Sequence, residues 1–418
     1  MPAVYRILVI ADDLSGAADC GIAFTHAGLS SVVLFSGEQA APGGVDVLAV
    51  DADSRHLAPQ PAAAVHLGLA QRHLGGGALL YKKIDSTLRG NIGAELAAVI
   101  PQAGVAIVAP AFPGTGRTTR DGRVYVRDVP LEETEIWRRE GLSGVADIAA
   151  RLSRADVRVA RAELDLVRGG RDALRDALDA RAREGAQAIV CDAESDADLA
   201  AIASASVGME RPHFWVGSAG LARQLPAACG IGPASAAAPA ETGQPRGPVL
   251  VAVGSLSAVS RGQAERLASQ AGVAAIAIAP EALRAGGTHS GWCAAVAMLT
   301  AALDRGDDVV LTIGAGGSQD LGEGWLLCEA LARLVSPLAN RIGSLVATGG
   351  ETARALLTGL GAIGLRLVRE IEPGVVLCTA EGGGRPLPVV TKAGAFGTPD
   401  TLMHCRAVLR GMAPDAGT

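Results

Sequence analysis

The chain has 418 residues, of which 49% are hydrophobic and 19% charged, and its formal net charge at pH 7 is -6. This length favours two or three domains over one hydrophobic core. The acidic balance, with no run of Lys or Arg, argues against a nucleic-acid-binding surface, which needs a basic stripe. Apolar runs such as residues 273–279 have the length of a strand, and they are far shorter than the roughly 18 residues of a membrane span.

The N-terminus and the cysteines point to a cytoplasmic protein. The first residues, MPAVYRILVIADD, lack the long apolar segment and the cleavage site of a secretory signal. Seven cysteines are scattered without a C-x-x-C pair, which favours reduced, buried thiols. Only three of the 37 basic residues are lysines, Lys82, Lys83 and Lys392, so a compact ammonium group could be needed at these positions.

Short β-rich runs alternate with Ala- and Leu-rich helical stretches along the chain, which is typical of parallel sheets covered by helices. The predicted strands are 6–11, 46–51, 78–84, 105–110, 188–193 and 213–218, followed by a second series at 248–254, 273–279, 308–314, 344–350 and 375–380. Residues 230–247, rich in Pro, Ala and Gly, predict a linker. We therefore expect an α/β protein with domains 1–229 and 248–418, each a mainly parallel sheet covered by helices, and the active site in the cleft between them.

Two aspartates, Asp12 and Asp13, follow the first predicted strand and stand directly before a predicted helix. Ligands bind beyond the carboxyl ends of the strands in open α/β sheets, so this position is a candidate site. One Asp is explained as a helix N-cap. Two exceed what one cap needs, and we expect at least one of them to bind hydroxyls, hold a metal or act as a general base.

Two further segments follow predicted strands. Segment 51–57, DADSRHL, offers Arg55, whose planar fork can grip a carboxylate, although a surface ion pair explains it equally well. Segment 81–96 is richer, and a helix is predicted to begin in it near Ser86 or Thr87. Alternation along its strand places Lys83 on one side and Lys82 on the other. Its charged and polar residues, Lys82, Lys83, Asp85, Ser86, Arg89 and Asn91, predict an anion- and hydroxyl-binding site at a helix N-terminus. Residues 109–126 nearby predict a loop followed by a strand or hairpin.

The C-terminal half carries three Gly-rich loops, 254–260, 312–320 and 347–353, and each follows a strand and opens a helix. Such loops suit phosphates because their backbone N–H groups converge. A single loop is weak evidence, but three of them together with segment 391–397, TKAGAFG, favour a nucleotide site. Lys392 in that segment is predicted to meet a nucleotide phosphate, and the alternative is that it ends a strand in solvent.

Several familiar motifs are absent or misleading. The sequence holds no P-loop, no G-x-S-x-G elbow and no H-E-x-x-H pair. The one complete G-x-G-x-x-G, at residues 359–364, runs from a predicted helix into a strand, which is the reverse of the dinucleotide-binding context. This weakens the interpretation of the chain as a dehydrogenase. If no absorbance change occurs with NAD(H) or NADP(H), that interpretation is excluded.

The ordered motifs ADDLSGA, DSRHL, YKKIDSTLRGNIGAEL, PAFPGTGRTT and VPLEETE, followed by VGSLS, ATGGETA and TKAGAFG, resemble the four-carbon acid sugar kinase family over nearly the whole chain. Members phosphorylate threonate, erythronate or 3-oxo-tetronate with ATP. The resemblance implies contacts to the acid from Asp12, Arg55, Lys82, Lys83, Ile84 and Asp85, and contacts to ATP from Ser255, Ala347, Thr348, Gly349, Gly350 and Gly394. Ser15 stands where the family usually has Thr, which keeps the hydroxyl.

The sequence thus predicts an ATP-dependent kinase that acts on the terminal hydroxyl of a four-carbon sugar acid such as D-threonate or D-erythronate. Arg55, Lys82 or Lys83 would hold the carboxylate, with Arg89 nearby, and Asp12, Asp13 or Asp85 would take the proton. Mg²⁺ is expected on the phosphates, although no protein ligand for it is evident. The alternatives are a 3-oxo-tetronate kinase and a non-catalytic sensor that binds the acid and the nucleotide. The oligomeric state stays open.

Overall fold

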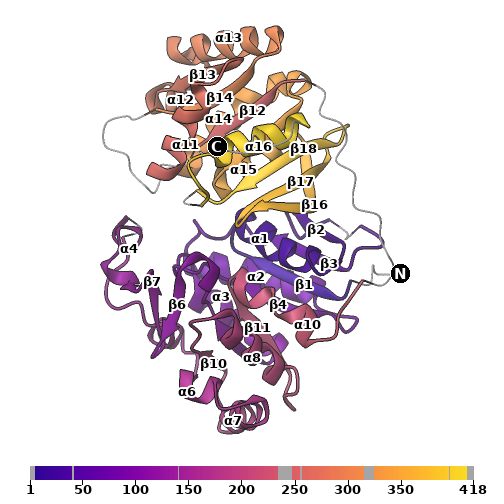
Figure 1. Ribbon diagram of the computed structural model, residues 1–418, viewed down its shortest axis with the longest axis vertical. Coiled ribbons are helices and arrows are strands. Elements are labelled where there is room, and N and C mark those ends of the chain that lie inside the picture. The colour runs from indigo at the N-terminus through magenta and orange to yellow at the C-terminus, as the bar shows by residue number, and fades with distance from the viewer. Residues whose placement is uncertain are drawn as a thin grey trace, which may run out of the picture. The chain divides into compact units, whose positions relative to one another are not determined.

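The computed structural model describes residues 5–39, 42–139, 141–233, 247–254, 257–314, 324–394 and 396–411. The chain divides into two compact units, unit 1 with residues 1–237 and unit 2 with residues 238–418 (Figure 1). The division falls inside the segment 230–247 that the composition predicts as a linker. No helix in the described ranges has the length and apolar character that crossing a membrane requires.

Unit 1 is built on a sheet whose described strands all pair in parallel. In spatial order they are β2 (Ser31–Leu34), β3 (Val47–Asp51), β1 (Ile7–Ala11), β4 (Leu79–Lys83), β11 (His213–Gly217), β5 (Val105–Ala109), β10 (Ala188–Cys191) and β9 (Val159–Ala162). Because the strands are parallel, their carboxyl ends meet at one edge of the sheet. Each predicted strand of the first series is present, whereas β2 and β9 were not predicted.

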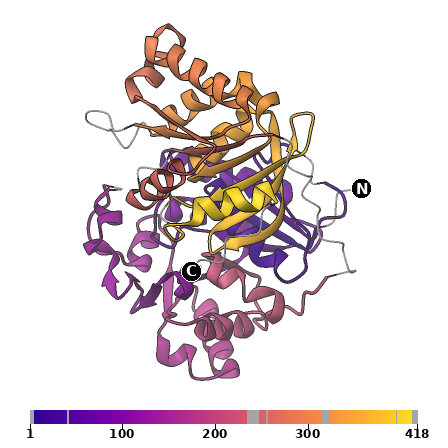
Figure 2. The same ribbon diagram turned by 45° about the horizontal axis from the view of Figure 1, so that its top comes forward.

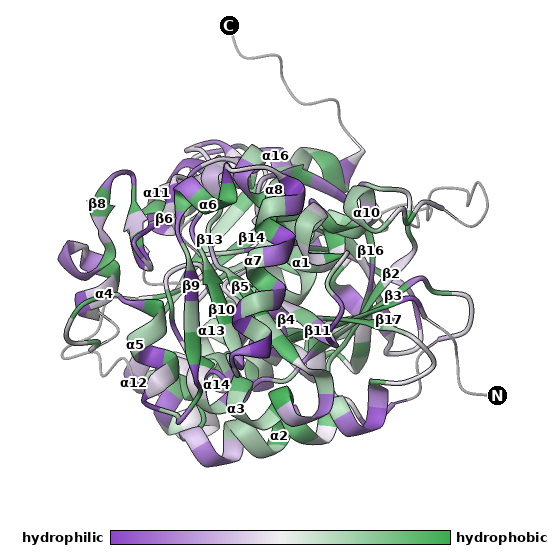
Figure 3. Ribbon diagram, turned by 90° about the horizontal axis from the view of Figure 1, so that it is seen from below, coloured by the Kyte–Doolittle hydropathy of each residue, from purple (hydrophilic) through white to green (hydrophobic). Residues whose placement is uncertain are grey.

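Helices form two layers around the sheet of unit 1, and both faces of strands such as β1 and β5 are therefore buried. One layer contains α2 (Pro59–His73), α3 (Ile92–Ala103) and α5 (Ile148–Ser153). The other contains α1 (Leu14–Thr25), α7 (Arg171–Arg183), α8 (Asp196–Ser206), α9 (Ala219–Ala222) and α10 (Leu225–Ala228). Figure 3 shows the contrast between the largely hydrophobic β5 and β10 and the polar residues of α7.

A small antiparallel sheet extends unit 1 beyond β5. It consists of β6 (Arg117–Arg120), β7 (Arg123–Val126) and β8 (Val129–Pro130). The predicted loop and hairpin at residues 109–126 is confirmed by β6 and β7. Short helices α4 (Glu135–Arg139) and α6 (Leu164–Val167) follow later in the chain. Single 3₁₀ turns lie at η1 (Pro113–Thr115), η2 (Leu131–Glu133), η3 (Gly286–Thr288) and η5 (Ser336–Arg341).

Unit 2 holds a mixed sheet. Its order is β13 (Val273–Ile278), β14 (Asp308–Ile313), β12 (Val249–Val253), β15 (Ser344–Thr348), β18 (Leu387–Lys392), β17 (Val375–Gly382) and β16 (Ala362–Glu372). The strands from β13 to β18 pair in parallel, and the pairs β18–β17 and β17–β16 are antiparallel. The prediction of a mainly parallel α/β fold is confirmed, although the antiparallel pairing of β16, β17 and β18 was not foreseen.

Helices also flank the sheet of unit 2. α11 (Ala258–Ala268) and α16 (Thr401–Arg410) pack together, and α16 lies across β12, β15 and β18 (Figure 2). The remaining helices are α12 (Pro280–Ala285), α13 (Ser290–Arg305), α14 (Gly324–Val335) and α15 (Gly350–Gly359). The core beneath α11 and α16 joins Val251 of β12, Val346 of β15 and Leu402 of α16. This packing fixes the ends of β12, β15 and β18, where the predicted nucleotide loops begin.

Candidate active site

Arg55 and the two aspartates after β1 form one charged cluster. Asp12 accepts two parallel hydrogen bonds from Arg55, at 2.7 Å from Nε to Oδ2 and 3.0 Å from Nη2 to Oδ1. Asp13 accepts from Nη1 of Arg55 at 2.9 Å, and its Oδ1 also accepts from the backbone N–H of Gly16 at 2.9 Å. Asp13 is therefore the N-cap of α1 as well as an ion-pair partner. All three guanidinium nitrogens of Arg55 face aspartate oxygens.

Asp12 and Arg55 stay ionised at neutral pH. Burial by itself would raise the pKa of Asp12, but the Arg55 guanidinium outweighs burial and holds that pKa below its ordinary value. Burial would likewise lower the pKa of Arg55, and the carboxylates of Asp12 and Asp13 instead raise it. The prediction that Arg55 grips the acid's carboxylate with its fork does not fit this geometry, because that fork is already bound to Asp12.

Asp85 lies in a tight turn after β4, and the predicted helix start at Ser86 or Thr87 is wrong. Oδ1 of Asp85 accepts from the N–H and the hydroxyl of Thr87 at 2.7 and 2.8 Å, and Arg89 bonds the other carboxylate oxygen. Leu88 and Gly90 have positive φ angles of 58° and 83°, which an α-helix cannot contain. The helix α3 begins only at Ile92, after the turn.

The same turn brings its backbone against the aspartate cluster at Gly90. A Cβ at this position would lie 2.8 Å from Oδ2 of Asp12 and 3.9 Å from Cγ of Arg55. The positive φ of Gly90 and this close approach both require glycine. The turn between β4 and α3 therefore closes over Asp12, which is only 2% exposed.

Lys82 points away from this cluster into a buried network that the sequence did not predict. Its Nζ lies 2.9 Å from Oε2 of Glu95 in α3 and donates to the carbonyl of Lys83 at 2.8 Å. Oε1 of Glu95 accepts from the hydroxyl of Ser54 at 2.9 Å, and Nε2 of His66 lies 2.9 Å from that hydroxyl. Ser54 directly precedes Arg55, so the network holds the segment that carries Arg55.

Lys83 projects to the opposite side of β4, towards the first turn of α1, as alternation predicted. Its Nζ lies 2.8 Å from the point where a Cβ on Gly16 would stand. Burial disfavours its charge, but the acidic groups around it, Cys20, Asp13 and Asp12, outweigh burial and raise its pKa. The next predicted site residue, Ile84, is 1% exposed and belongs to the hydrophobic core, and its N–H donates to the carbonyl of Gly217.

Arg117 of β6 adds a cation that the sequence did not assign to the site. It is 9% exposed, and burial lowers its pKa, while Asp85 acts in the opposite direction and Arg89 and Arg127 act with burial. The small sheet thus places a guanidinium close enough to Asp85 and Arg89 to affect them. A basic residue in a hairpin gives no local signal for this role, because only the fold shows which way the hairpin leans.

In unit 2, Lys392 organises the loop that follows β18. Its Nζ donates to the carbonyls of Ala393, Gly394 and Phe396 at 3.1, 3.3 and 3.0 Å and to the hydroxyl of Ser260 at 3.1 Å. Lys392 is fully buried, so the solvent-exposed alternative is wrong. Burial lowers its pKa to about 8. The ammonium is bound to its own loop.

The predicted nucleotide segments of unit 2 meet at the carboxyl ends of its parallel strands. Ala347 and Thr348 end β15, and Gly349, with φ at 92°, precedes α15 and donates its N–H to the carbonyl of Lys392 at 2.7 Å. Gly350 opens α15. The hydroxyl of Ser260 in α11 donates to the carbonyl of Gly394 at 2.5 Å. Ser255 and residues 315–320 of the predicted loops lie outside the described residues.

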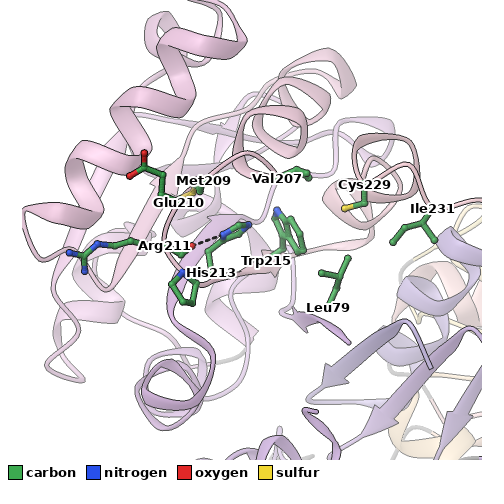
Figure 4. Close-up of a pocket in the computed structure, with 10 residues that line it drawn as sticks. Leu79, Val207, Met209, Glu210, Arg211, His213, Trp215, Cys229 and Ile231 are labelled. Atoms are coloured by element: carbon green, nitrogen blue, oxygen red, sulfur yellow. Dashed lines mark hydrogen bonds between the residues drawn. The ribbon is translucent and has the colours of Figure 1, made fainter. Parts of the chain in front are cut away.

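A pocket of about 520 Å³ in unit 1 lies away from the charged cluster (Figure 4). Leu79 and His213, which line it, are the first residues of β4 and β11, so the pocket is at the amino ends of these strands. Trp215 in its wall donates to the hydroxyl of Ser206 at 2.8 Å. The candidate site lies at the carboxyl ends of the strands, where ligands of open α/β sheets bind.

Comparison with protein families divides the chain in the same way as its two units. Residues 7–225 match the family described as "Sugar-binding N-terminal domain", and residues 250–402 match the "Nucleotide-binding C-terminal domain". The charged cluster falls within the first match and the Lys392 loop within the second.

Relatives with assigned names are similar over nearly the full length. A D-threonate kinase of Cupriavidus necator is 47% identical over 98% of this chain and 99% of its own. A D-threonate kinase of Salmonella typhimurium is 33% identical over 95% and 96% of the two chains. A D-erythronate kinase of Heliobacterium modesticaldum is 29% identical over 96% of each.

Solved structures share the fold. A Salmonella typhimurium crystal structure superposes with a TM-score of 0.79 at 22% identity, covering 96% of this chain and 98% of the other. Haemophilus influenzae protein HI1011 gives a TM-score of 0.72 at 20% identity, covering 96% and 100%. Taken with the two family matches and the full-length relatives, these findings show that the chain belongs to the four-carbon acid sugar kinase family.

Proposed function

We propose that this protein is an ATP-dependent kinase that transfers phosphate to the terminal hydroxyl of a four-carbon sugar acid, with D-threonate as its first candidate substrate. The observation that carries the proposal is the Asp12–Arg55–Asp13 cluster at the carboxyl edge of a parallel sheet, in the unit that matches a sugar-binding domain. The 47% identity to a D-threonate kinase favours that acid over the erythronate and oxo acids of more distant relatives.

Unit 1 supplies the proton acceptor in this proposal. Asp12 and Asp13 are the better candidates, because each carboxylate accepts two described hydrogen bonds, whereas that of Asp85 accepts three. Asp85 is less suited, since Thr87 occupies Oδ1 twice and Arg89 binds the other oxygen. A weakly basic carboxylate suffices, because phosphoryl transfer depends mainly on positioning and on neutralising charge. Arg55 holds both aspartates in place for the incoming hydroxyl.

Unit 2 supplies the nucleotide site. The loop of Ala347–Gly350 and the loop after Lys392 present backbone groups at neighbouring strand ends, which suits phosphates. Lys392 acts there by fixing the loop around Gly394 through its carbonyls. In the described ranges no group of three or more His, Cys, Asp or Glu is arranged to hold a metal. Mg²⁺ on the ATP phosphates would neutralise their charge.

A coupled assay of ADP release tests the function. The purified chain is given ATP and Mg²⁺ with D-threonate, D-erythronate, L-threonate or 3-oxo-tetronate, and a reaction without acid measures background ATP hydrolysis. We expect D-threonate to give the highest kcat/KM. Binding of acid and ATP without ADP release from any acid would instead identify a sensor.

Substitution of each aspartate by asparagine tests the proton acceptor. Removing a positioned general base costs about a hundredfold to ten-thousandfold in rate, so we expect a loss of that size in kcat for either Asp12→Asn or Asp13→Asn. Asp85→Asn keeps the turn-forming oxygen, and we expect a smaller loss. If Asp85→Asn alone abolishes turnover while the other two variants stay active, the assignment to the Asp12–Arg55–Asp13 cluster is wrong.

A further inference from the structure

Gln263 of α11 is a buried amide that binds the loop after β18, although the sequence did not single it out. Its side chain belongs to a residue that is only 1% exposed. Its Nε2 donates to the carbonyl of Phe396 at 3.2 Å and to the carbonyl of Thr398 at 2.6 Å. Its Oε1 is buried without a hydrogen-bond partner among the described residues. Because burying an unsatisfied acceptor is unfavourable, the two donated bonds are the reason for an amide at this position.

The carbonyls of this loop are drawn towards Lys392 and α11. Nζ of Lys392 binds the carbonyls of Ala393 and Phe396 at 3.1 and 3.0 Å, and Gln263 joins it at Phe396. In a planar trans peptide the C=O and the following N–H point in opposite directions, and the described residues contain no cis peptide. The N–H groups of Gly394 and Gly397 therefore point away from the ammonium of Lys392.

These two N–H groups are available to a ligand. Neither of them donates a hydrogen bond within the described part of the chain. Gly397 is exposed, so a ligand can reach it. Its φ is 90°, and a Cβ at this position would collide with the side chain of Thr401, so the backbone there requires glycine. Backbone N–H groups that a loop presents together bind anions.

We propose that Gln263 is a positioning residue of the nucleotide site, which holds the carbonyl of Phe396 inward and so presents the N–H of Gly397 to a phosphate of ATP. This rests on the proposed function and deepens it. Ser260, one turn earlier on α11, supports the same loop by donating to the carbonyl of Gly394 at 2.5 Å. A merely structural tie between α11 and the loop would not distinguish the phosphates from the adenosine, whereas the proposed role concerns the phosphates alone.

ADP and adenosine are the probes, and their binding to the full chain is measured by displacement of a fluorescent ATP analogue. The variants are Gln263→Met, which keeps the approximate length of the side chain without its donor, and Ser260→Ala, which is safer for folding. Gln270→Met is the same substitution two residues beyond the end of α11, at a half-buried position, and serves as the control. Thermal unfolding shows whether each variant is folded.

We expect Gln263→Met to weaken ADP binding by about threefold to tenfold, the factor that corresponds to one neutral hydrogen bond, and to leave adenosine binding unchanged. Ser260→Ala should weaken ADP binding less, because Lys392 still binds the carbonyl of Gly394. Gln270→Met should bind both ligands as the wild type does. The proposal is overturned if the folded variants bind ADP unchanged, or if ADP and adenosine binding fall by the same factor.

Steady-state kinetics separate this proposal from the proposed function. With an active wild type, Gln263→Met should raise the KM for ATP by a similar factor and leave the KM for the acid unchanged. If the wild type phosphorylates an acid and Gln263→Met has an unchanged KM for ATP, the positioning role fails and the kinase function stands. If no acid gives ADP release while Gln263→Met still weakens ADP binding selectively, the kinase function fails and the positioning role stands.

Discussion

Two of the three buried lysines in the described chain, one from each unit, are held in opposite ways. Lys82 in unit 1 is 1% exposed and forms an ion pair with the equally buried Glu95. Lys392 in unit 2 is fully buried, and its described hydrogen-bond acceptors are carbonyl and hydroxyl oxygens. Burial lowers the pKa of Lys392 to about 8, whereas Glu372 is only a minor influence in the other direction.

The contrast separates two structural uses of a lysine. A carboxylate partner fixes a charge in place and fastens two elements together, here β4 and α3. Neutral acceptors instead let one ammonium gather several carbonyls of a single loop, at the expense of a less stable charge. A kinase needs both a rigid binding site for the acid and a backbone loop of fixed conformation for the nucleotide.

Breaking the ion pair of unit 1 should have the largest effect. Glu95→Ala leaves the Lys82 ammonium buried and unpaired, and we expect a loss of about 3–5 kcal/mol in the free energy of unfolding. Chemical denaturation of the full chain, followed through the unfolding of unit 1, measures this loss in the free energy of unfolding. Lys82→Met combined with Glu95→Met removes both charges, and most of the loss should be recovered. A Glu95→Ala protein as stable as the wild type would show that the pair does not fasten β4 to α3.

Removing the lysine of unit 2 should act on the nucleotide. Lys392→Met leaves the carbonyls of Ala393, Gly394 and Phe396 without their donor, and each unsatisfied acceptor costs about 1–3 kcal/mol. We expect the KM for ATP to rise by about tenfold, equivalent to about 1.4 kcal/mol, and the KM for the acid to change little.

The pH dependence of the same KM provides the control. Because the pKa of Lys392 is about 8, its ammonium loses a proton between pH 7 and 9 in the folded protein. The wild-type KM for ATP should therefore rise over this range, and that of Lys392→Met should not follow it. A selective effect of Lys392→Met on the acid would mean that the roles of the two units are reversed.

The sequence predicted the strands and their end residues well, but not the partners of those residues. Alternation along β4 correctly separated Lys82 from Lys83. Which of the two lysines is held in a buried ion-pair network depends on Glu95 of α3 and His66 of α2. The local sequence of a helix does not show that one of its residues makes such a contact. The same limit explains why Arg55 was expected to grip the substrate, since its bonds to Asp12 and Asp13 span more than forty residues.

Errors in the predicted elements have local causes. The helix predicted to start near Ser86 does not form there, because Leu88 has a positive φ. Nothing in the local sequence predicts this backbone conformation for a leucine. Strand β16 was predicted only as the strand that follows residues 359–364, and its antiparallel pairing with β17, through shifts in register, was not foreseen. Both features depend on tertiary contacts rather than on local propensity.

The smallest expected effect concerns His66, the remaining member of the unit 1 network. Burial, aided by the positive charge of Lys82, lowers its pKa, while Glu95 and Asp12 oppose this. Its Nδ1 is buried without a hydrogen-bond partner among the described residues, so a second ring proton would have nothing to bind. His66 is therefore neutral in the folded protein at pH values where the unfolded chain, with an ordinary pKa near 6.5, is protonated. The unfolded state then binds more protons, and the free energy of unfolding should fall as the pH drops below about 6.5, by at most about 1.4 kcal/mol per pH unit.

His66→Gln tests this pH dependence, because glutamine keeps an N–H for Ser54 but cannot titrate. The stability of the variant should therefore decline less than that of the wild type between pH 6.5 and 5, with the difference at pH 8 as the reference. Equal slopes for the two proteins in that window would show that His66 takes up its proton in the folded state as readily as in the unfolded one.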